Sequence, residues 1–314
     1  MNEDVSVVVV NYNTKEHLLA CIDSLSGEGV GMVVVADNGS TDGSAQALAE
    51  HHPTAKWVPT GANLGYGTGA NIGAALSDGA YVLVTNPDVT FEPGAVTTMR
   101  RFLGTNPEVA IVGPRIVDAA GELYPSARRF PDMMEALGHG IVGQFWAGNP
   151  FSRRYRMTDW DHAGQREVDW VSGSCFLARR EAWDEVGGFD TTFFMYLEDV
   201  DLCRRLRDKG WSIAYEPAAQ VTHIQGVSTD RHPYRMLFAH HIAMWRFAER
   251  TTAGWRRWLL PLVVVGLGVR LGMTMARRAL APRLAARSGP GHSPGAVPGD
   301  PPAPGRMGPG VISR

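Results

Sequence analysis

The feature that most constrains the fold is an alternation of short apolar runs with more polar, helix-like stretches over the first 113 residues. The apolar runs cover residues 5–10, 32–36, 81–85 and 109–113, and a short strand is expected near 56–58. Short runs that are apolar throughout are typical of strands buried on both faces, and intervening helices favour parallel pairing. The alternation therefore predicts an α/β fold, with a Rossmann-like, mostly parallel sheet and helices on both of its faces.

Polar side chains follow three of the predicted strands. They are Asn11 and Asn13 after the first strand, Asp37 and Asn38 after the second, and Asn86 and Asp88 after the strand 81–85. In open parallel sheets, ligands bind beyond the carboxyl ends of the strands. We therefore expect these three clusters to converge on one ligand site.

A glycine-rich stretch, G-A-N-L-G-Y-G-T-G-A-N-I-G, covers residues 61–73. It is not a dinucleotide fingerprint, because that motif belongs in the first strand-to-helix turn, which here reads N-Y-N-T. The chain also has no GxxxxGK[ST] sequence, which argues against P-loop chemistry. We expect Gly65 and its neighbours to allow close approach of a nucleotide, with Asn63 and Asn71 supplying side-chain contacts.

Asp88 has two interpretations. An aspartate after Asn86-Pro87 is commonly a turn or helix-capping residue. At a strand end beside Asp37, it can instead hold a divalent cation together with the oxygens of a diphosphate, to which Asn86 would add a neutral oxygen.

The segment F-F-M-Y-L-E-D-V-D, residues 193–201, places Glu198 and Asp199 at the start of a predicted helix, 200–209. Asp199 can cap that helix, where a negative charge is favoured, or act as a general base. His223, which follows a predicted strand at 212–217, can be a metal ligand or an ordinary loop histidine.

Composition excludes several classes of protein. The formal net charge is −2, so no overall electrostatic attraction to nucleic acid is expected. The three cysteines, Cys21, Cys175 and Cys203, include no CxxC pair, which argues against a disulfide framework or a zinc cluster. Because the first residues are acidic and lead directly into a strand, no secretory signal is expected, and a reducing, cytosolic setting is favoured.

The C-terminal part differs in composition from the rest of the chain. The uninterrupted apolar run 258–269 is shorter than the roughly 20 residues that span a bilayer, and Arg270 follows it directly. Tryptophans and arginines flank the run, which favours an amphipathic helical region, 251–287, at an anionic membrane surface. The alternative is a helix packed on the domain or on a second subunit. Residues 288–314 are rich in Gly and Pro and are expected to be disordered.

A series of motifs carries a family resemblance. In chain order it reads V-V-V-V-N-Y-N, V-A-D-N-G-S-T-D-G-S, N-L-G-Y-G-T-G-A-N-I-G, N-P-D, G-S-C-F-L-A-R-R, G-G-F-D, F-F-M-Y-L-E-D-V-D-L-C-R-R and H-I-Q-G-V-S-T. The series resembles family 2 inverting glycosyltransferases of the GT-A fold, from about residue 5 to 245. Within that family it is most similar to rhamnosyltransferases that act on polyprenyl-diphosphate-linked sugars. This implies a GT-A domain at 1–250, with a nucleotide-sugar-binding half, 1–114, and an acceptor and catalytic half, 115–250.

The resemblance also implies roles for individual residues. Residues that would hold the nucleotide-sugar donor are Asn11, Asn13, Asp37, Asn38, Asn63, Gly65, Asn71 and Asn86. Asp199, paired with Glu198, matches the catalytic base. Asp88 and His223 match residues that contact the metal, Mg²⁺ or Mn²⁺, or the diphosphate. The implied acceptor is a polyprenyl-diphosphate-linked saccharide, used in cell-wall or surface polysaccharide synthesis at the cytoplasmic face of the cell membrane, with the enzyme bound peripherally.

One departure from the family pattern bears on the metal. The D-x-D motif of the family is N-P-D here, so one carboxylate is missing and a cation would be held by less negative charge. Two other functions stay open from the residues: a sugar nucleotidyltransferase, and a nucleotide-sugar-binding protein without transferase activity.

Overall fold

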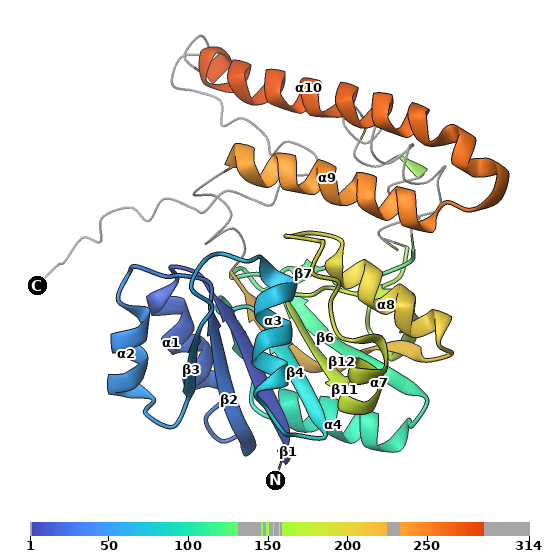
Figure 1. Ribbon diagram of the computed structural model, residues 1–314. Coiled ribbons are helices and arrows are strands. Elements are labelled where there is room, and N and C mark those ends of the chain that lie inside the picture. Colours follow the sequence, from blue (N-terminus) through green and yellow to red (C-terminus); the bar gives the residue numbers. More distant parts are fainter. Residues whose placement is uncertain are drawn as a thin grey trace, which may run out of the picture.

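The computed structural model describes residues 2–130, 146, 149–150, 153, 157, 159–224 and 233–285. Its main feature is one ten-stranded mixed sheet (Figure 1). The strands of this sheet are β1 (Asn2–Asn11), β2 (Val30–Asp37), β3 (Lys56–Pro59), β4 (Tyr81–Thr85), β5 (Val89–Phe91), β6 (Val109–Val117), β7 (Leu123–Tyr124), β9 (Arg166–Val168), β11 (Cys175–Arg179) and β12 (Ser212–His223). A separate two-stranded sheet pairs β8 (Ala127–Arg128) with β10 (Trp170–Val171).

The strand order is β3-β2-β1-β4-β11-β6-β12-β5, with β7 paired to β6 and β9 to β12. The pairs β1–β2, β1–β4, β2–β3 and β6–β12 are parallel. The alternation in the sequence predicted the parallel pairing of β1, β2, β3 and β4, whereas β12 lies outside the alternating region. β11 lies between β4 and β6 and is antiparallel to both. The two predicted halves of the domain are therefore parts of one continuous sheet.

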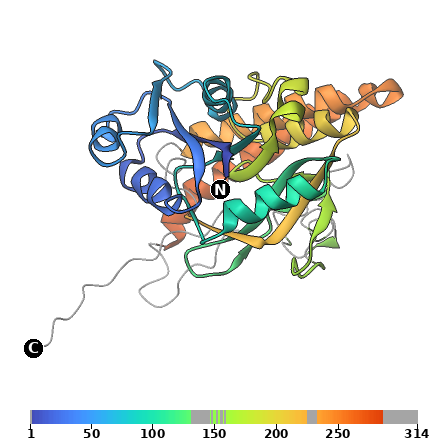
Figure 2. The same cartoon turned by 90° about the horizontal axis from the view of Figure 1, so that it is seen from below.

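Helices cover both faces of the sheet (Figures 1 and 2). They are α1 (Lys15–Ser24), α2 (Ser44–His51), α3 (Tyr66–Ala75), α4 (Ala95–Thr105), α7 (Arg180–Val186) and α8 (Glu198–Asp208). Side chains alternate across each strand, so Val8 and Val10 of β1 pack with α3, α7 and α8, whereas Val7 and Val9 pack with α1 and α4. Burial on both faces explains why these strands are apolar throughout.

Two strands extend beyond the predicted apolar runs. β6 continues through Pro114 to Val117, and β12 continues through Pro217 to His223. Proline lacks the N–H that a ladder requires. The β6–β12 register shifts between Glu216 and Gln220, so Pro217 falls in the irregular part of the strand. This irregular stretch allows β12 to reach His223, which the predicted strand 212–217 did not include.

The C-terminal part forms α9 (Pro233–Thr251), a short 3₁₀ turn (Gly254–Leu259) and α10 (Leu260–Ala285). In Figure 1, α9 lies beyond the carboxyl ends of the parallel strands, and α10 lies beyond α9. Ala243 and Phe247 bury α9 against the domain, and Arg270 Nη1 of α10 lies 2.8 Å from the sulfur of Met244.

The predicted apolar C-terminal helix is present, but it is longer than the run 258–269. The segment Gly254–Ala276 is long and apolar enough to cross a membrane by length and composition, and nearly all of it is exposed or partly exposed. The argument from shortness was therefore wrong, because the helix continues through Arg270. The predicted disordered tail, 288–314, lies outside the described residues.

Candidate active site

The first two strand ends form one hydrogen-bonded cluster. Parallel pairing places Asn11 beside Asp37, and the Asn11 amide donates to Asp37 Oδ1 at 2.9 Å. Asp37 also accepts from the backbone of Gly39 and Ser40 and from the Ser40 hydroxyl. Both Asp37 and Asn11 are buried. Asn13, at φ +55°, accepts from Thr41 N–H at 2.7 Å and stays partly exposed at the mouth of this cluster.

The glycine-rich stretch is tied to the same cluster. The Asn38 amide donates to the Gly65 carbonyl at 3.1 Å, and Asn63 accepts from Gly65 N–H at 3.1 Å. Gly65 has φ +93°, and a Cβ there would overlap the carbonyl oxygen of Phe194. Asn71 lies farther along α3, where both ends of its amide bond the backbone of Phe189. Asn71 thus fastens the segment that leads to α8.

The Asn86-Pro87-Asp88 turn faces the end of β12. Antiparallel pairing sets Val89 beside His223, and Ile224 N–H donates to the Asp88 carbonyl at 3.0 Å. His223 Nε2 consequently lies 3.2 Å from Asp88 Oδ1 and 3.4 Å from the Asn86 amide nitrogen. The structure therefore brings His223 next to Asn86 and Asp88, although His223 follows Asn86 by 137 positions in the chain.

The chemistry of this group fits a divalent cation. Within the described part of the chain, His223 Nδ1 is buried without a hydrogen-bond partner, and buried Asp88 Oδ1 has only the 3.2 Å contact with His223 Nε2. A carboxylate and an imidazole are suitable ligands for Mn²⁺, and Mg²⁺ is commonly held by one or two carboxylates plus substrate phosphates. No cluster of three or more His, Cys, Asp or Glu residues occurs among the described residues, so the protein would supply a partial coordination shell.

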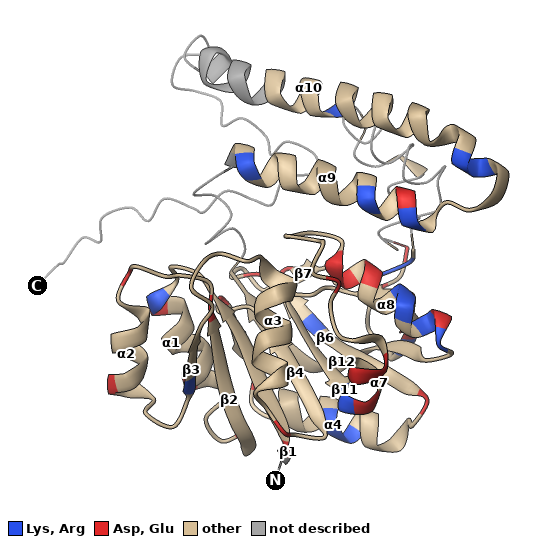
Figure 3. Ribbon diagram, viewed as in Figure 1, with Lys and Arg blue, Asp and Glu red and all other residues tan. Residues whose placement is uncertain are grey.

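Asp199 is held at the start of α8 by two backbone donors. Its Oδ2 accepts from Gly173 N–H at 2.8 Å, and its Oδ1 accepts from Val200 N–H at 2.9 Å. The helix begins after Leu197, which has φ +63°, so Asp199 lies inside the first turn and is not the capping residue. Figure 3 shows acidic residues gathered at this end of α8, beneath α9. The side chain remains partly exposed.

Glu198 and Asp199 differ in their environments. Burial raises the pKa of Glu198 to about 8, to which the neighbouring Asp199 charge contributes, and Glu198 Oε2 has no hydrogen-bond partner among the described residues. Burial also raises the pKa of Asp199, but hydrogen bonds from Gly173 and Val200 and the positive charge of Arg128 oppose this effect. At neutral pH, Glu198 is therefore the protonated member of the pair and Asp199 is the carboxylate.

One short segment joins the two parts of the site. β4 and β11 pair Thr85 with Cys175, and Asn86 N–H donates to the Ser174 carbonyl at 2.8 Å. Gly173, the preceding residue, donates to Asp199. The Asp88–His223 group and Asp199 thus lie on two sides of the same backbone turn.

Two contributors were not assigned from the sequence. Gly173 was quoted only as part of G-S-C-F, although its N–H orients the Asp199 carboxylate. Tyr66 lies within the glycine-rich stretch, and its hydroxyl donates to the Gly173 carbonyl. Burial raises the pKa of Tyr66 well above its ordinary value, so it remains a donor. The sequence did contain a signal for this role. Glycine alone would allow close approach of a nucleotide, so the large tyrosine between Gly65 and Gly67 indicates an additional contact.

Comparison with known proteins identifies relatives along most of the chain. The profile of the family described as "Glycosyltransferase like family 2" matches residues 2–257. An N-acetylglucosaminyl-diphospho-decaprenol L-rhamnosyltransferase of Mycobacterium tuberculosis is 40% identical over 275 residues, covering 83% of this chain and 89% of the relative. The rhamnosyltransferase WbbL of Escherichia coli K12 is 24% identical over 227 residues, covering 70% of this chain and 83% of the relative.

A solved structure supports the fold. The mannosyltransferase PcManGT from Pyrobaculum calidifontis, in complex with GDP-Man and Mn²⁺, superposes with a TM-score of 0.53 over 91% of this chain and 76% of its own, at 18% identity. At this identity the likeness bears on the fold alone. The predicted GT-A architecture is confirmed.

Proposed function

The chain belongs to glycosyltransferase-like family 2, and on that basis we propose that it transfers a sugar, with inversion, from a nucleotide diphosphate donor to a lipid-linked saccharide. We name rhamnose as the sugar and a polyprenyl-diphosphate-linked saccharide as the acceptor. The support is the 40% identity to a decaprenol-linked rhamnosyltransferase, which extends over 83% of this chain. The observation within the molecule that carries the proposal is the Asp199 carboxylate, held by two backbone N–H groups beside a protonated Glu198.

Asp199 is the general base in this proposal. It takes the proton from the acceptor hydroxyl while that oxygen attacks the anomeric carbon from the face opposite the departing nucleotide diphosphate, and the configuration inverts. Its raised pKa favours proton transfer, and the Gly173 and Val200 N–H groups fix its orientation. Glu198, uncharged at neutral pH, adds no second negative charge next to the base.

The donor occupies the carboxyl ends of β1, β2 and β4 in this proposal. Asn13 and Asn63 are partly exposed beside the strand ends, and we infer that they contact the nucleotide directly. Asn11, Asp37 and Asn38 are buried. The Asn11 amide donates to Asp37 and the Asn38 amide donates to the Gly65 carbonyl, so we infer that these residues shape the pocket.

A divalent cation, Mg²⁺ or Mn²⁺, would be held by Asp88 and His223, with Asn86 adjacent. When bound, such a cation neutralises negative charge on the diphosphate leaving group. Because a single carboxylate is present, most of the remaining coordination would come from the diphosphate and water.

We further propose that the enzyme binds the membrane surface peripherally, on the cytoplasmic side, through its C-terminal region. Leu262, Val265 and Val269 form an exposed stripe on α10, and Trp258 precedes them. Arg270, in the same helix, contacts α9. A helix held on one side by its own domain and apolar on the other suits the interface between water and lipid.

The test of the transfer reaction is direct. Purified protein is incubated with a panel of nucleotide sugars and a polyprenyl-diphosphate-linked N-acetylglucosamine acceptor, with and without a chelator. We expect transfer from dTDP-rhamnose and loss of most of the rate with the chelator. Binding of nucleotide sugars without transfer to any lipid-linked acceptor would refute the proposal. Release of pyrophosphate from a nucleoside triphosphate would indicate a nucleotidyltransferase instead.

A further inference from the structure

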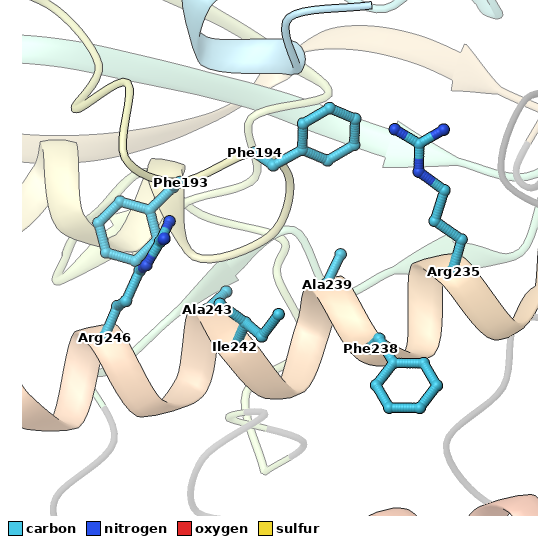
Figure 4. Close-up of a pocket in the computed structure, with 8 residues that line it drawn as sticks. All are labelled: Phe193, Phe194, Arg235, Phe238, Ala239, Ile242, Ala243 and Arg246. Carbon is cyan, nitrogen blue, oxygen red and sulfur yellow. The ribbon is translucent and has the colours of Figure 1, made fainter.

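A groove of about 280 Å³ separates α9 from the loop that precedes α8 (Figure 4). Its walls are mainly apolar and include two arginines. The residues that the argument uses are Phe193, Phe194, Arg235, Phe238, Ile242 and Arg246. Phe238 and Ile242 are about half exposed, at 45% and 51%, although they belong to a helix that packs on the domain. Large apolar side chains that stay exposed in this way can contact a ligand.

The arginines stand at the two ends of the apolar stripe on α9. Arg235, Phe238, Ile242 and Arg246 recur at helical spacing on one face, and eleven residues of helix separate the arginines by about 16 Å. Figure 4 shows both arginine side chains directed from α9 toward the Phe193–Phe194 loop. The Arg235 guanidinium lies 5.2 Å from the centre of the Phe194 ring.

Neither arginine is neutralised within the described part of the chain, where the ion pairs of α9 involve only Arg250. Arg250 differs because it pairs with Asp190. Two cations without carboxylate partners, beside an apolar surface, are complementary to a ligand that has an anionic head and an apolar body. A sugar has no apolar body that would occupy this surface.

The groove adjoins the site of the reaction. The Phe194 carbonyl accepts Tyr66 N–H at 3.0 Å, so the groove wall is bonded to the glycine-rich stretch. Asp199 follows Phe194 by five residues in the same segment. Tyr196, between them, contacts the His240 ring of α9 at 5.1 Å between ring centres. The groove therefore lies next to the predicted base, on the side of the molecule that carries α10 (Figure 1).

We propose that this groove binds the polyprenyl diphosphate of the acceptor, an inference that rests on the proposed transfer to a lipid-linked saccharide. The diphosphate is bound by Arg235 and Arg246. The first isoprene units contact Phe238 and Ile242, and the saccharide extends past Phe194 to Asp199. The chain of the lipid then leaves toward α10 and the membrane. Lipid recognition is thereby separate from the donor pocket at the ends of β1, β2 and β4.

A binding experiment tests the site without requiring turnover. Farnesyl diphosphate, which has the head and the first isoprene units but no sugar, is titrated into the full chain by calorimetry. The variant R235Q/R246Q removes both charges, and R101Q, an exposed arginine on α4 at the opposite side of the sheet, is the matched control. We expect the double variant to weaken farnesyl diphosphate binding about tenfold or more, and R101Q to leave it unchanged. Retained nucleotide binding shows that each variant is folded.

Two results of this titration would overturn the proposal. One is equal binding of farnesyl diphosphate by the wild type and the double variant. The other is equal affinity for inorganic pyrophosphate and farnesyl diphosphate, because the apolar wall would then contribute nothing. The variant I242S provides a second check, because it removes apolar surface without adding a charge: it should weaken farnesyl diphosphate binding but leave pyrophosphate binding unchanged.

A kinetic experiment distinguishes the acceptor from bilayer lipid. With a detergent-solubilised polyprenyl-diphosphate-linked acceptor, R235Q/R246Q should raise the acceptor KM about tenfold or more and leave the donor KM within twofold. If the variant instead loses only its binding to phosphatidylglycerol vesicles, with the acceptor KM unchanged, the groove contacts the bilayer and the proposal fails. If the wild type transfers no sugar at all, the proposed function fails, whereas the farnesyl diphosphate titration still decides whether the groove binds a lipid diphosphate.

Discussion

Replacing Asp199 with Asn separates the chemical role of this residue from its structural role. The carboxylate accepts two backbone N–H groups, from Gly173 at 2.8 Å and from Val200 at 2.9 Å. An amide has one accepting oxygen, so one of these bonds is lost, which costs about 1–3 kcal/mol of folding stability. Loss of a general base lowers a rate by about 10²- to 10⁴-fold, equivalent to about 3–5 kcal/mol in the activation barrier.

We therefore expect Asp199→Asn to unfold at a moderately lower temperature, to bind the nucleotide-sugar donor nearly as the wild type does, and to lose at least 99% of its turnover. The assays are thermal unfolding, donor titration and initial rates with a lipid-linked acceptor. Asp208→Asn, on the same helix with its side chain 71% exposed, is the control and should behave as the wild type. If Asp199→Asn keeps more than a tenth of the wild-type rate, Asp199 is not the base.

Four further predictions follow from the site and the fold. The pKa of Glu198 is about 8 in the folded chain and 4.5 ordinarily, so Glu198 ionises at lower pH in the unfolded chain and the free energy of unfolding falls as pH rises from 4.5 to 8. Urea unfolding at a series of pH values should show a weaker pH dependence for Glu198→Gln. An unchanged pH dependence would contradict the raised pKa. His223→Gln should raise the Mn²⁺ concentration for half-maximal rate by about tenfold or more, and an unaltered Mn²⁺ titration would exclude His223 as a ligand. Gly65→Ala should destabilise the chain more than Gly94→Ala in thermal unfolding, because both positions have positive φ but only at Gly65 does a Cβ meet backbone. Removing residues 254–314 should abolish co-sedimentation with anionic vesicles while the domain stays folded, and retained co-sedimentation would count against the helix as the anchor.

The sequence was sufficient to predict β1, β4 and β6 because each of these strands is buried on both faces. Burial of that kind requires continuous apolar runs, which are visible without an alignment. The antiparallel β11 was not predicted, because its five residues, Cys175–Arg179, show no pattern that reveals its direction. Strand direction depends on the end of the sheet from which the chain enters, and that is set by the topology of the whole domain. The extension of β12 to His223 was missed for a related reason: Pro217 ends a strand by the local rule, whereas the register shift beside it permits continuation.

The predicted site residues divide by the kind of information that they required. Asp88 could be located from its position after a strand, but its closeness to His223 depends on the pairing of β5 with β12, a contact across 134 residues of sequence. Asn71 was interpreted as a contact to the nucleotide because of its place in the glycine-rich stretch. In the structure the Asn71 amide hydrogen-bonds the backbone N–H and carbonyl of Phe189. A sequence pattern does not predict the direction in which a helical side chain points. The groove beside α9 was not predicted, because its two walls come from separate segments.

The position of β11 has a consequence for protein engineering. Exchanging the donor-binding part of this chain for that of a relative with another sugar preference suggests a junction near residue 114. The strand order places β11 between β4 and β6, and β12 between β6 and β5, so such a junction would force four new strand pairings between sequences that never evolved together. A junction after His223 leaves the sheet intact and exchanges α9 and α10, the helices of the proposed acceptor groove and membrane contact. We therefore expect modular exchange to alter acceptor preference, whereas donor preference would have to be changed residue by residue.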